Sequence, residues 1–248
     1  MEEKIKIETK EDGTPQNVKS KIDNFLYYYK WHTIVAAVIL VVIAILVFQT
    51  ASRTSYDGYI LYAGPYEIKK TGINGDIDPY SEVISSLKSV CYDFDNDNNV
   101  NVALQNLFVL NEDEANKLYE TNPGQSINST LVKEDSSMLS QTMMYGDYYV
   151  CFLSERLYNE YVEKYSGALF CKVGDYLGEG EYELANEWGV YLSSLGIYSL
   201  PGICDLPPDT VVCLRALSEV SQHLNKNEAT EAFRRSEIIF ENILSYVK

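Results

Sequence analysis

Residues 59–65 read YILYAGP, an apolar run of strand-forming side chains that closes on a Gly-Pro turn. Thirteen residues later, Asp78 and Pro79 are typical of a helix start, because aspartate caps free N–H groups and proline fits the first helical position. Apolar side chains then recur at helical spacing, and residues 100–104 alternate between apolar and polar as in a half-buried strand. The apolar helical positions are Val83, Ile84, Leu87, Val90 and Cys91. This stretch predicts a strand–helix–strand unit.

A second unit of the same kind follows. Residues 148–153 read YYVCFL and predict a strand, after which Ser154 is placed to cap a helix that Gly167 ends. Residues 168–171, ALFC, predict the next strand, and the apolar pattern of residues 229–247 predicts a final helix that docks on the domain. Repeated units of this kind favour the α/β class, with one mixed, partly parallel sheet and helices packed on it.

The run from Ile34 to Phe48 is apolar throughout and has no polar face. Residues 31–50 are long enough as a helix to cross the roughly 30 Å core of a bilayer, with aromatic residues at the N-terminal edge. The sequence therefore predicts a single transmembrane signal-anchor helix. A cleaved signal peptide fits less well, because residues 50–52, TAS, are a poor small-x-small site and the preceding segment is long. A core-packing helix of a soluble protein also fits less well, because such a helix usually keeps a polar face toward solvent.

Positive charge flanks the span unequally. Lys19, Lys21 and Lys30 precede it, whereas Arg53 alone follows closely. This excess predicts a cytoplasmic N-terminus and an extracytoplasmic C-terminal domain at the cell membrane. The expected organisation is a disordered cytoplasmic tail (1–30), the anchor (31–50), a linker (51–57) and an extracytoplasmic α/β domain (58–248).

The expected outer domain is strongly acidic. Beyond residue 53 there are 13 Lys or Arg and 30 Asp or Glu. Such a balance argues against nucleic acid as a partner, because that binding requires positive charge. It is compatible with cations, neutral sugars or basic protein surfaces, and also with a domain that is merely soluble.

Five cysteines lie in the outer domain, so at least one is free or joins another chain. Cys151 and Cys171 fall in apolar runs, where cysteine usually serves as a small buried hydrophobe. Cys204 and Cys213 flank a Pro-Pro turn and could pair across a hairpin.

The sharpest local motif is residues 93–101, DFDNDNNVN. Its expected metal ligands, at positions 1, 3, 5 and 7 of a calcium loop, are Asp93, Asp95, Asp97 and Asn99. The motif resembles the loops of the EF-hand and dockerin families, which implies Ca2+ as a possible cofactor. Asn98 stands in place of the turn glycine, and Leu104 in place of the bidentate acid at position 12. The alternative is a solvated acidic loop.

Catalytic motifs are scarce. The two histidines are His32, at the membrane edge, and His223, in a polar stretch, and neither a P-loop nor Gly-x-Ser-x-Gly occurs. We therefore expect a protein that is not an enzyme. A cell-surface hydrolase that uses a pair of the many acids is the weakest alternative.

Residues 138–172 resemble part of one lobe of the extracellular solute-binding proteins that serve ABC transporters. The motif is a helix followed by Met144-Tyr145-Gly146-Asp147, a strand, a helix and a short strand. The resemblance implies a ligand-binding cleft beside Gly146 and Asp147. Tyr149 departs from the family pattern, in which a second acid is common. The anchored layout also resembles single-pass membrane proteins of Gram-positive bacteria, a likeness that implies no activity.

Together these features favour a membrane-anchored, non-catalytic binding module that resembles a solute-binding protein. Its partner would be a small-molecule ligand. The main alternative is a scaffold or accessory subunit of a cell-envelope complex, whose partner would be a membrane protein.

Overall fold

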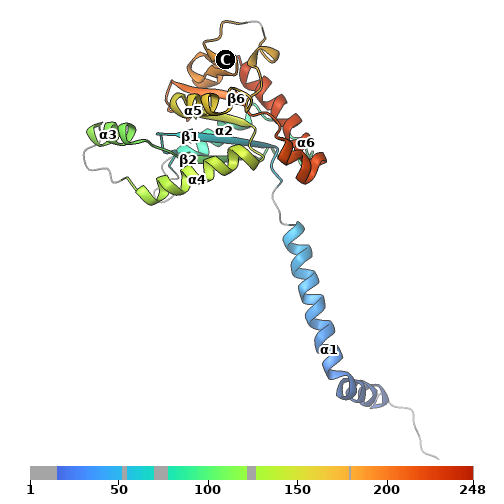
Figure 1. Cartoon of the computed structure of the whole chain (residues 1–248). Coiled ribbons are helices and arrows are strands. Elements are labelled where there is room, and N and C mark those ends of the chain that lie inside the picture. Colours follow the sequence, from blue (N-terminus) through green and yellow to red (C-terminus); the bar gives the residue numbers. More distant parts are fainter. Residues whose placement is uncertain (1–15, 52–54, 70–77, 122–126, 179, 248) are drawn as a thin grey trace, which may run out of the picture. The chain divides into compact units, whose positions relative to one another are not determined.

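The computed structural model describes residues 16–51, 55–69, 78–121, 127–178 and 180–247 (Figure 1). The chain divides into two compact units, residues 1–54 and 55–248. Each unit is described by itself.

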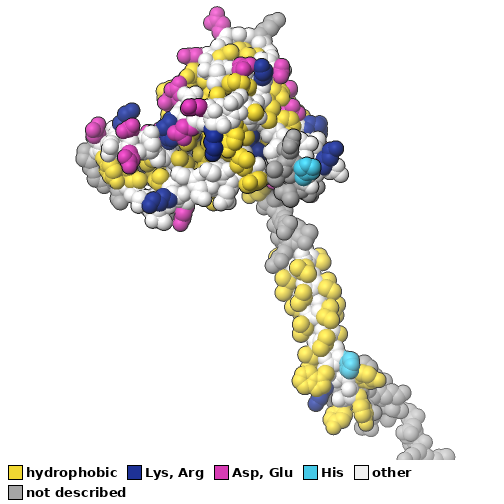
Figure 2. Space-filling model, viewed as in Figure 1, with side chains coloured by type: hydrophobic (Ala, Val, Ile, Leu, Met, Phe, Trp, Pro, Cys, Tyr) yellow, Lys and Arg dark blue, Asp and Glu magenta, His cyan; other side chains and the backbone are white. Residues whose placement is uncertain are grey.

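The first unit contains one long helix, α1 (Gln16–Ala51), which has non-helical backbone angles at Tyr29. Its segment Tyr27–Phe48 is 22 residues long, so it extends about 33 Å at 1.5 Å per residue. Among the described residues it is the one helix long and apolar enough to cross a membrane, and Figure 2 shows mostly apolar side chains on the part of α1 that is not drawn in grey. The helix reaches back to Gln16, inside the segment expected to be a tail, whereas residues 1–15 lie outside the described residues. Residues 16–30 hold neither glycine nor proline, so helix propagates into them at low cost.

The second unit is built on a six-stranded sheet in the order β2-β1-β3-β6-β5-β4. Strand β1 pairs in parallel with β2 and β3, whereas β3–β6, β6–β5 and β5–β4 are antiparallel. The prediction of a mixed, partly parallel α/β sheet is therefore confirmed. The strands are β1 (Gly58–Gly64), β2 (Val102–Phe108), β3 (Val150–Ser154), β4 (Leu184–Asn186), β5 (Gly189–Tyr191) and β6 (Thr210–Leu214).

Five α-helices and three short 3₁₀ turns accompany the described sheet. The helices are α2 (Pro79–Lys88), α3 (Glu112–Thr121), α4 (Ser129–Tyr145), α5 (Glu155–Tyr165) and α6 (Glu219–Leu244), and the 3₁₀ turns are η1 (Val173–Asp175), η2 (Leu192–Ser194) and η3 (Gly196–Ser199). Asp78 caps α2 through the N–H of Tyr80, and Ser154 caps α5 through the N–H of Leu157, as the sequence predicts. Helix α4 is capped by Asn128, whose side chain accepts the N–H groups of Thr130 and Leu131. Asp135, inside this helix, accepts the N–H of Phe108 at the end of β2 with its carboxylate, at 2.8 Å.

Helices cover both faces of the sheet. Ile60 and Tyr62 of β1 pack on one face with α2 and α6, whereas Leu61 and Ala63 pack on the other with α4 and α5. Each of these four side chains is at most 1 % exposed. A parallel strand buried on both faces carries continuous apolar residues, which explains why the YILYA run shows no alternation.

The guanidinium of Arg215 is fully buried beside the C-terminus of α4. It donates hydrogen bonds to the carbonyls of Met143, Gly146 and Tyr148, and lies 4.5 Å from the ring centroid of Tyr149. A cation is favourable there, because the last carbonyls of a helix have no partner within the helix and carry partial negative charge. Arg215 thus joins the end of α4 to the start of β3.

All five cysteines are free thiols in this structure. Cys151 is buried, as the sequence predicts, and lies directly opposite Cys213 in the β3–β6 ladder. Cys204 is exposed. The Cys204–Cys213 pairing allowed by the sequence is therefore not seen, because the strand register brings Cys213 to a different neighbour.

We predict that Arg215→Met destabilises the outer domain by about 3 kcal/mol or more, because the carbonyls of Met143, Gly146 and Tyr148 all lose their charged donor. Urea unfolding of the full chain in detergent, followed by Trp188 fluorescence in a Trp31→Phe background, measures this loss. Arg234→Met is the matched control, because the Arg234 side chain is 59 % exposed and, among the described residues, forms its ion pair with Glu231 on its own helix. Equal stability of the two variants would contradict the role assigned to Arg215.

Candidate functional site

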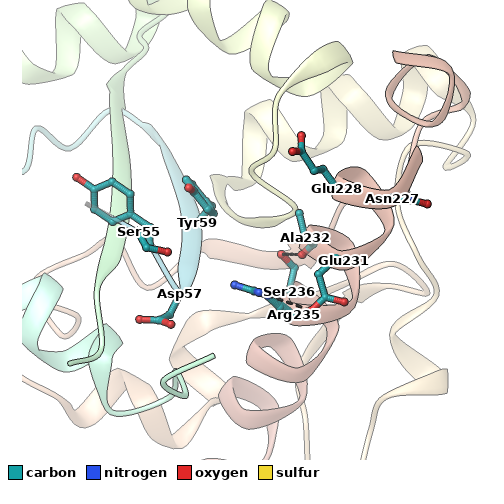
Figure 3. Close-up of a pocket in the computed structure, with 10 residues that line it drawn as sticks. Ser55, Asp57, Tyr59, Asn227, Glu228, Glu231, Ala232, Arg235 and Ser236 are labelled. Atoms are coloured by element: carbon teal, nitrogen blue, oxygen red, sulfur yellow. Dashed lines mark hydrogen bonds and ion pairs between the residues drawn. The ribbon is translucent and has the colours of Figure 1, made fainter. Parts of the chain in front are cut away.

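A cavity of about 550 Å³ lies between the start of β1 and the middle of α6 (Figure 3). Its wall on the β1 side comes from Ser55, Tyr56, Asp57 and Tyr59, and its wall on the α6 side from Asn227, Glu228, Glu231, Ala232, Arg235 and Ser236. In Figure 3 the side chain of Arg235 extends from α6 toward the start of β1. We call this space the β1–α6 cavity.

Asp57 connects this cavity to the acidic loop. Its side chain is buried, and its two carboxylate oxygens accept the N–H groups of Phe94 and Asn101, each at 2.8 Å. The N–H of Asp57 also donates to the carbonyl of Asn101, at 2.8 Å. A buried carboxylate is costly unless it is hydrogen-bonded, and these bonds fix the start of β1 against both ends of the loop.

The acidic loop folds around its own first carboxylates. Asp93 accepts the N–H groups of Asp97 and Asn98, at 3.2 and 2.8 Å, and Asp95 accepts the N–H of Asp97 at 3.1 Å. Asn98, which stands in place of the turn glycine, has a φ of 66°, a left-handed conformation that asparagine adopts more readily than most residues.

Three carboxylates meet beside this loop. Oxygens of Asp57, Asp93 and Asp95 all lie within 4.8 Å of one another, a spacing that a hard cation could bridge. Asp97 accepts the N–H of Asn99 at 2.7 Å, and the Asn99 amide donates to the Asp97 carbonyl at 3.3 Å. The structure therefore brings Asp93 and Asp95 together with Asp57. Asp97 and Asn99, also expected to be ligands, instead bond to each other.

Sequence reasoning missed Asp57. It lies 36 positions before Asp93, and only the pairing of β1 with β2 brings the two together. One signal in the sequence could have linked Asp57 to Asp93. Asp57 directly precedes one buried strand, and the acidic loop directly precedes the strand that pairs with it. In this arrangement Asp57 supplies a third carboxylate, where the motif itself ends with Leu104 in place of an acid.

Neighbouring groups hold Asp95 ionised. A hydrogen bond from the Ser55 side chain is the main cause that lowers the pKa of Asp95, and the Asp97 N–H and the charge of Arg235 act in the same direction. Arg235 bonds Glu231 at 3.1 Å, and its guanidinium lies 5.3 Å from the ring centroid of Phe94. It therefore links α6 to the acidic loop.

Tyrosine rings border the cavity. The Tyr56 and Tyr59 ring centroids are 5.8 Å apart at an interplanar angle of 64°, and those of Tyr59 and Tyr148 are 5.6 Å apart at 88°. Burial is the main cause that raises the pKa of both Tyr59 and Tyr148, and the charge of Asp147 adds to it. These phenols therefore stay neutral and able to donate hydrogen bonds well above neutral pH.

The positions expected from the solute-binding resemblance lie next to this rim. Gly146 ends α4, its N–H donates to the Thr142 carbonyl at 2.9 Å, and its own carbonyl accepts from Arg215. Its polar backbone groups are thus engaged within the fold. Asp147 is exposed and acts electrostatically on Tyr59.

A second cavity, of about 280 Å³, lies between α4 and α5 and is lined in part by Arg156, Glu160 and Lys164. Arg156 makes two hydrogen bonds to Glu114, at 3.0 and 2.8 Å, and one to Glu160 at 2.8 Å. The charge of Arg156 is therefore already balanced within the fold, by Glu114 and Glu160.

No family model matches the chain, and neither the curated proteins nor the solved structures contain a significant match to it.

The calcium site stays a prediction. Two ligand sets can be compared, namely Asp93, Asp95, Asp97 and Asn99 from the sequence motif, and Asp57, Asp93 and Asp95 from the structure. We expect calcium to raise the melting temperature of the full chain relative to chelator, with a gain of about 2.7 kcal/mol at a free concentration one hundred times Kd. Asp93→Asn should abolish that gain with either ligand set. Asp57→Asn should abolish it if the ligands are Asp57, Asp93 and Asp95, whereas Asp97→Asn should abolish it if the ligands follow the sequence motif.

Asp57→Asn also has an effect that does not need calcium. In chelator we expect it to cost about 1–3 kcal/mol of unfolding free energy, because an amide group cannot accept both the Phe94 and the Asn101 N–H. The exposed Asp205→Asn is the control. Unchanged stability of Asp57→Asn in chelator would contradict this role.

The tyrosine rim predicts alkaline sensitivity. The folded-state pKa of Tyr148 is raised, and an unfolded tyrosine titrates near about 10. Its contribution to stability is therefore complete below that pH and is lost as the pH rises through the folded-state pKa. We expect the melting temperature of Tyr148→Phe to fall less steeply above about pH 9.5 than that of the unsubstituted protein. Tyr119→Phe, on α3, is the control, and parallel profiles for Tyr148→Phe would refute the effect.

Proposed function

We propose that this protein is a single-pass membrane protein whose acidic domain lies outside the cytoplasm and binds a small ligand without transforming it. The length and apolar character of Tyr27–Phe48 support the membrane span. The excess of lysine before that segment supports a cytoplasmic N-terminus.

The β1–α6 cavity is the observation that carries the proposal. Its volume of about 550 Å³ falls within the usual range of small-molecule sites, roughly 300–1,000 Å³. Tyr59 of β1 and six residues of α6 line it, and strands and helices are rigid elements suited to holding a site in shape, whereas Ser55, Tyr56 and Asp57 directly precede β1. Its lining combines aromatic rings, carboxylates, a guanidinium and hydroxyl groups.

Electrostatics within the cavity favour binding over hydrolysis. A glycoside hydrolase needs one carboxyl group whose pKa is raised so that it can donate a proton. Hydrogen bonds from Arg234 and Arg235 instead lower the pKa of Glu231. The Ser236 hydroxyl donates to the Ala232 carbonyl at 2.9 Å, which engages its proton within α6.

The solute-binding resemblance adds limited support to the proposal. Asp147 acts electrostatically on Tyr59, which lines the β1–α6 cavity, but neither Gly146 nor Asp147 is among the lining residues.

Ligand-dependent stabilisation of the full chain in detergent tests the proposal. We expect at least one compound in a library of sugars, amino acids, amines and peptides to raise the melting temperature reported by Trp188. A bulky substitution in the cavity wall, Ala232→Phe, should remove that shift. The control is Ala216→Phe, which lies after β6 and outside the lining.

A flat screen would refute the small-ligand proposal. Crosslinking and co-purification from membranes would then test the alternative of a scaffold or accessory subunit.

A further inference from the structure

Two buried cysteines face each other across the sheet. Cys151 of β3 lies directly opposite Cys213 of β6, and both side chains are completely buried. They belong to the same part of the core, so both point to the face of the sheet that α4 and α5 cover. The Cys213 Sγ lies 3.7 Å from the Cys151 carbonyl oxygen, and a side-chain hydrogen bond with Cys151 adds to burial in raising the pKa of Cys213. The two thiols are therefore neighbours.

The backbone spacing of this pair suits a disulfide. In the same ladder the N–H of Arg215 donates to the carbonyl of Tyr149, which lies opposite it, at 2.7 Å. Pairs alternate along an antiparallel ladder, so Cys151 and Cys213, two positions further on, also form a hydrogen-bonded pair, with Cα atoms about 5.5 Å apart. Disulfides join Cα atoms about 4.4–6.8 Å apart. Opposite Cβ atoms start about 4.5–5.5 Å apart and a disulfide needs about 3.5–4.5 Å, so closing the bond draws the two strands slightly together.

The other three cysteines are placed differently. Cys91 and Cys171 pack with the core on the other face of the sheet, and Cys204 is exposed. Of the five cysteines, Cys151 thus shares its buried face with Cys213 alone.

We propose that a disulfide joins Cys151 to Cys213 when the domain folds outside the cytoplasm, and that this bond fastens the two halves of the sheet together. Disulfides form and persist in oxidising compartments outside the cytoplasm. Strands β2, β1 and β3 pair in parallel, whereas β6, β5 and β4 pair in antiparallel fashion, so the β3–β6 pair is the junction between the halves. The inference takes from the proposed function only the placement outside the cytoplasm and does not depend on ligand binding.

The oxidant is a small disulfide, RSSR, which reacts by thiol–disulfide exchange. The thiolate of one cysteine attacks a sulfur of RSSR and expels RS⁻, which leaves a mixed disulfide on that cysteine. The thiolate of the other cysteine then attacks the protein sulfur of this mixed disulfide and expels the second RS⁻. The two RS⁻ groups take up the two protons that the cysteines lost. The protein is thus oxidised by two electrons, and RSSR is reduced to two RSH.

Burial restricts the time at which the bond can form. Both thiols lie beneath α4 and α5, and burial is the main cause that raises the pKa of Cys213. The folded domain therefore offers an oxidant neither a thiolate nor access to one. The bond is made while the chain folds, before these helices close over the face.

Refolding in two redox mixtures tests the proposal. The full chain, in a Cys204→Ala background that removes the exposed thiol, is unfolded in urea with reductant. It is then refolded in detergent with glutathione that is either mainly oxidised or mainly reduced. Free thiols are alkylated, and linked peptides are mapped by mass spectrometry. We expect the Cys151–Cys213 link in most chains from the oxidised mixture and in few from the reduced one.

A displaced cysteine is the matched control. Val212→Cys combined with Cys213→Ala keeps the number of cysteines and moves the thiol by one position, to the opposite face of β6. We expect this variant to form no link with Cys151. Cys171→Ala changes a thiol outside the pair and should retain the Cys151–Cys213 link. Circular dichroism checks that each variant folds.

Each outcome bears on a separate part of the proposal. No link, or a link between other cysteines, after refolding in the oxidised mixture overturns it. A link that forms equally fast when oxidised glutathione is added to the folded protein overturns the assigned timing. Membranes prepared with N-ethylmaleimide, which blocks free thiols, then report the state in the cell. A Cys151–Cys213 link there supports the proposal, and its absence overturns the link in the cell without affecting the proposed binding function.

Discussion

The buried carboxylate of Asp57 is the constraint on which both the sheet edge and the candidate site depend. It receives the N–H groups of Phe94 and Asn101, so the acidic loop can adopt only a conformation that presents both donors. The same group lines the β1–α6 cavity and stands with Asp93 and Asp95. An ionised group in such a place is tolerated because hydrogen bonds replace the water that it loses. Fold and site are therefore joined through one side chain.

Local patterns were enough to predict much of the fold. The YILYA and YYVCFL runs became strands, and the caps at Asp78 and Ser154 start α2 and α5, because strand propensity and capping depend on neighbours in sequence. The antiparallel pairing of β3 with β6 could not be read this way, because it joins segments about sixty residues apart. Asp135 is another example of a non-local contact. An aspartate at this position is typical of a helix cap, but its carboxylate accepts the N–H of Phe108 at the end of β2.

In the candidate site, too, the residues close together in sequence could be predicted, whereas those brought together by tertiary packing could not. The spacing of acids in residues 93–101 identifies a compact carboxylate group, because a short loop must fold around its own side chains. The third carboxylate, from Asp57, and the guanidinium of Arg235 come from β1 and α6, which tertiary packing alone brings to the loop. The tyrosine rim is equally non-local. Tyr59 and Tyr148 belong to different strand–helix units and meet because β1 and β3 are neighbours.

The placement of α6 has a consequence for the order in which the protein can be made. Ile239, Phe240 and Ile243 are completely buried in the core layer that covers β1, which itself belongs to the first segment of the domain. Strand β1 is therefore synthesised about 180 residues before the part of α6 that packs on it. Until then α2 covers this face of β1 without α6, and such long-range closure is slow and leaves apolar surface open to wrong contacts. A domain arranged in this way gains from being held apart from other nascent chains until its last turns of helix arrive.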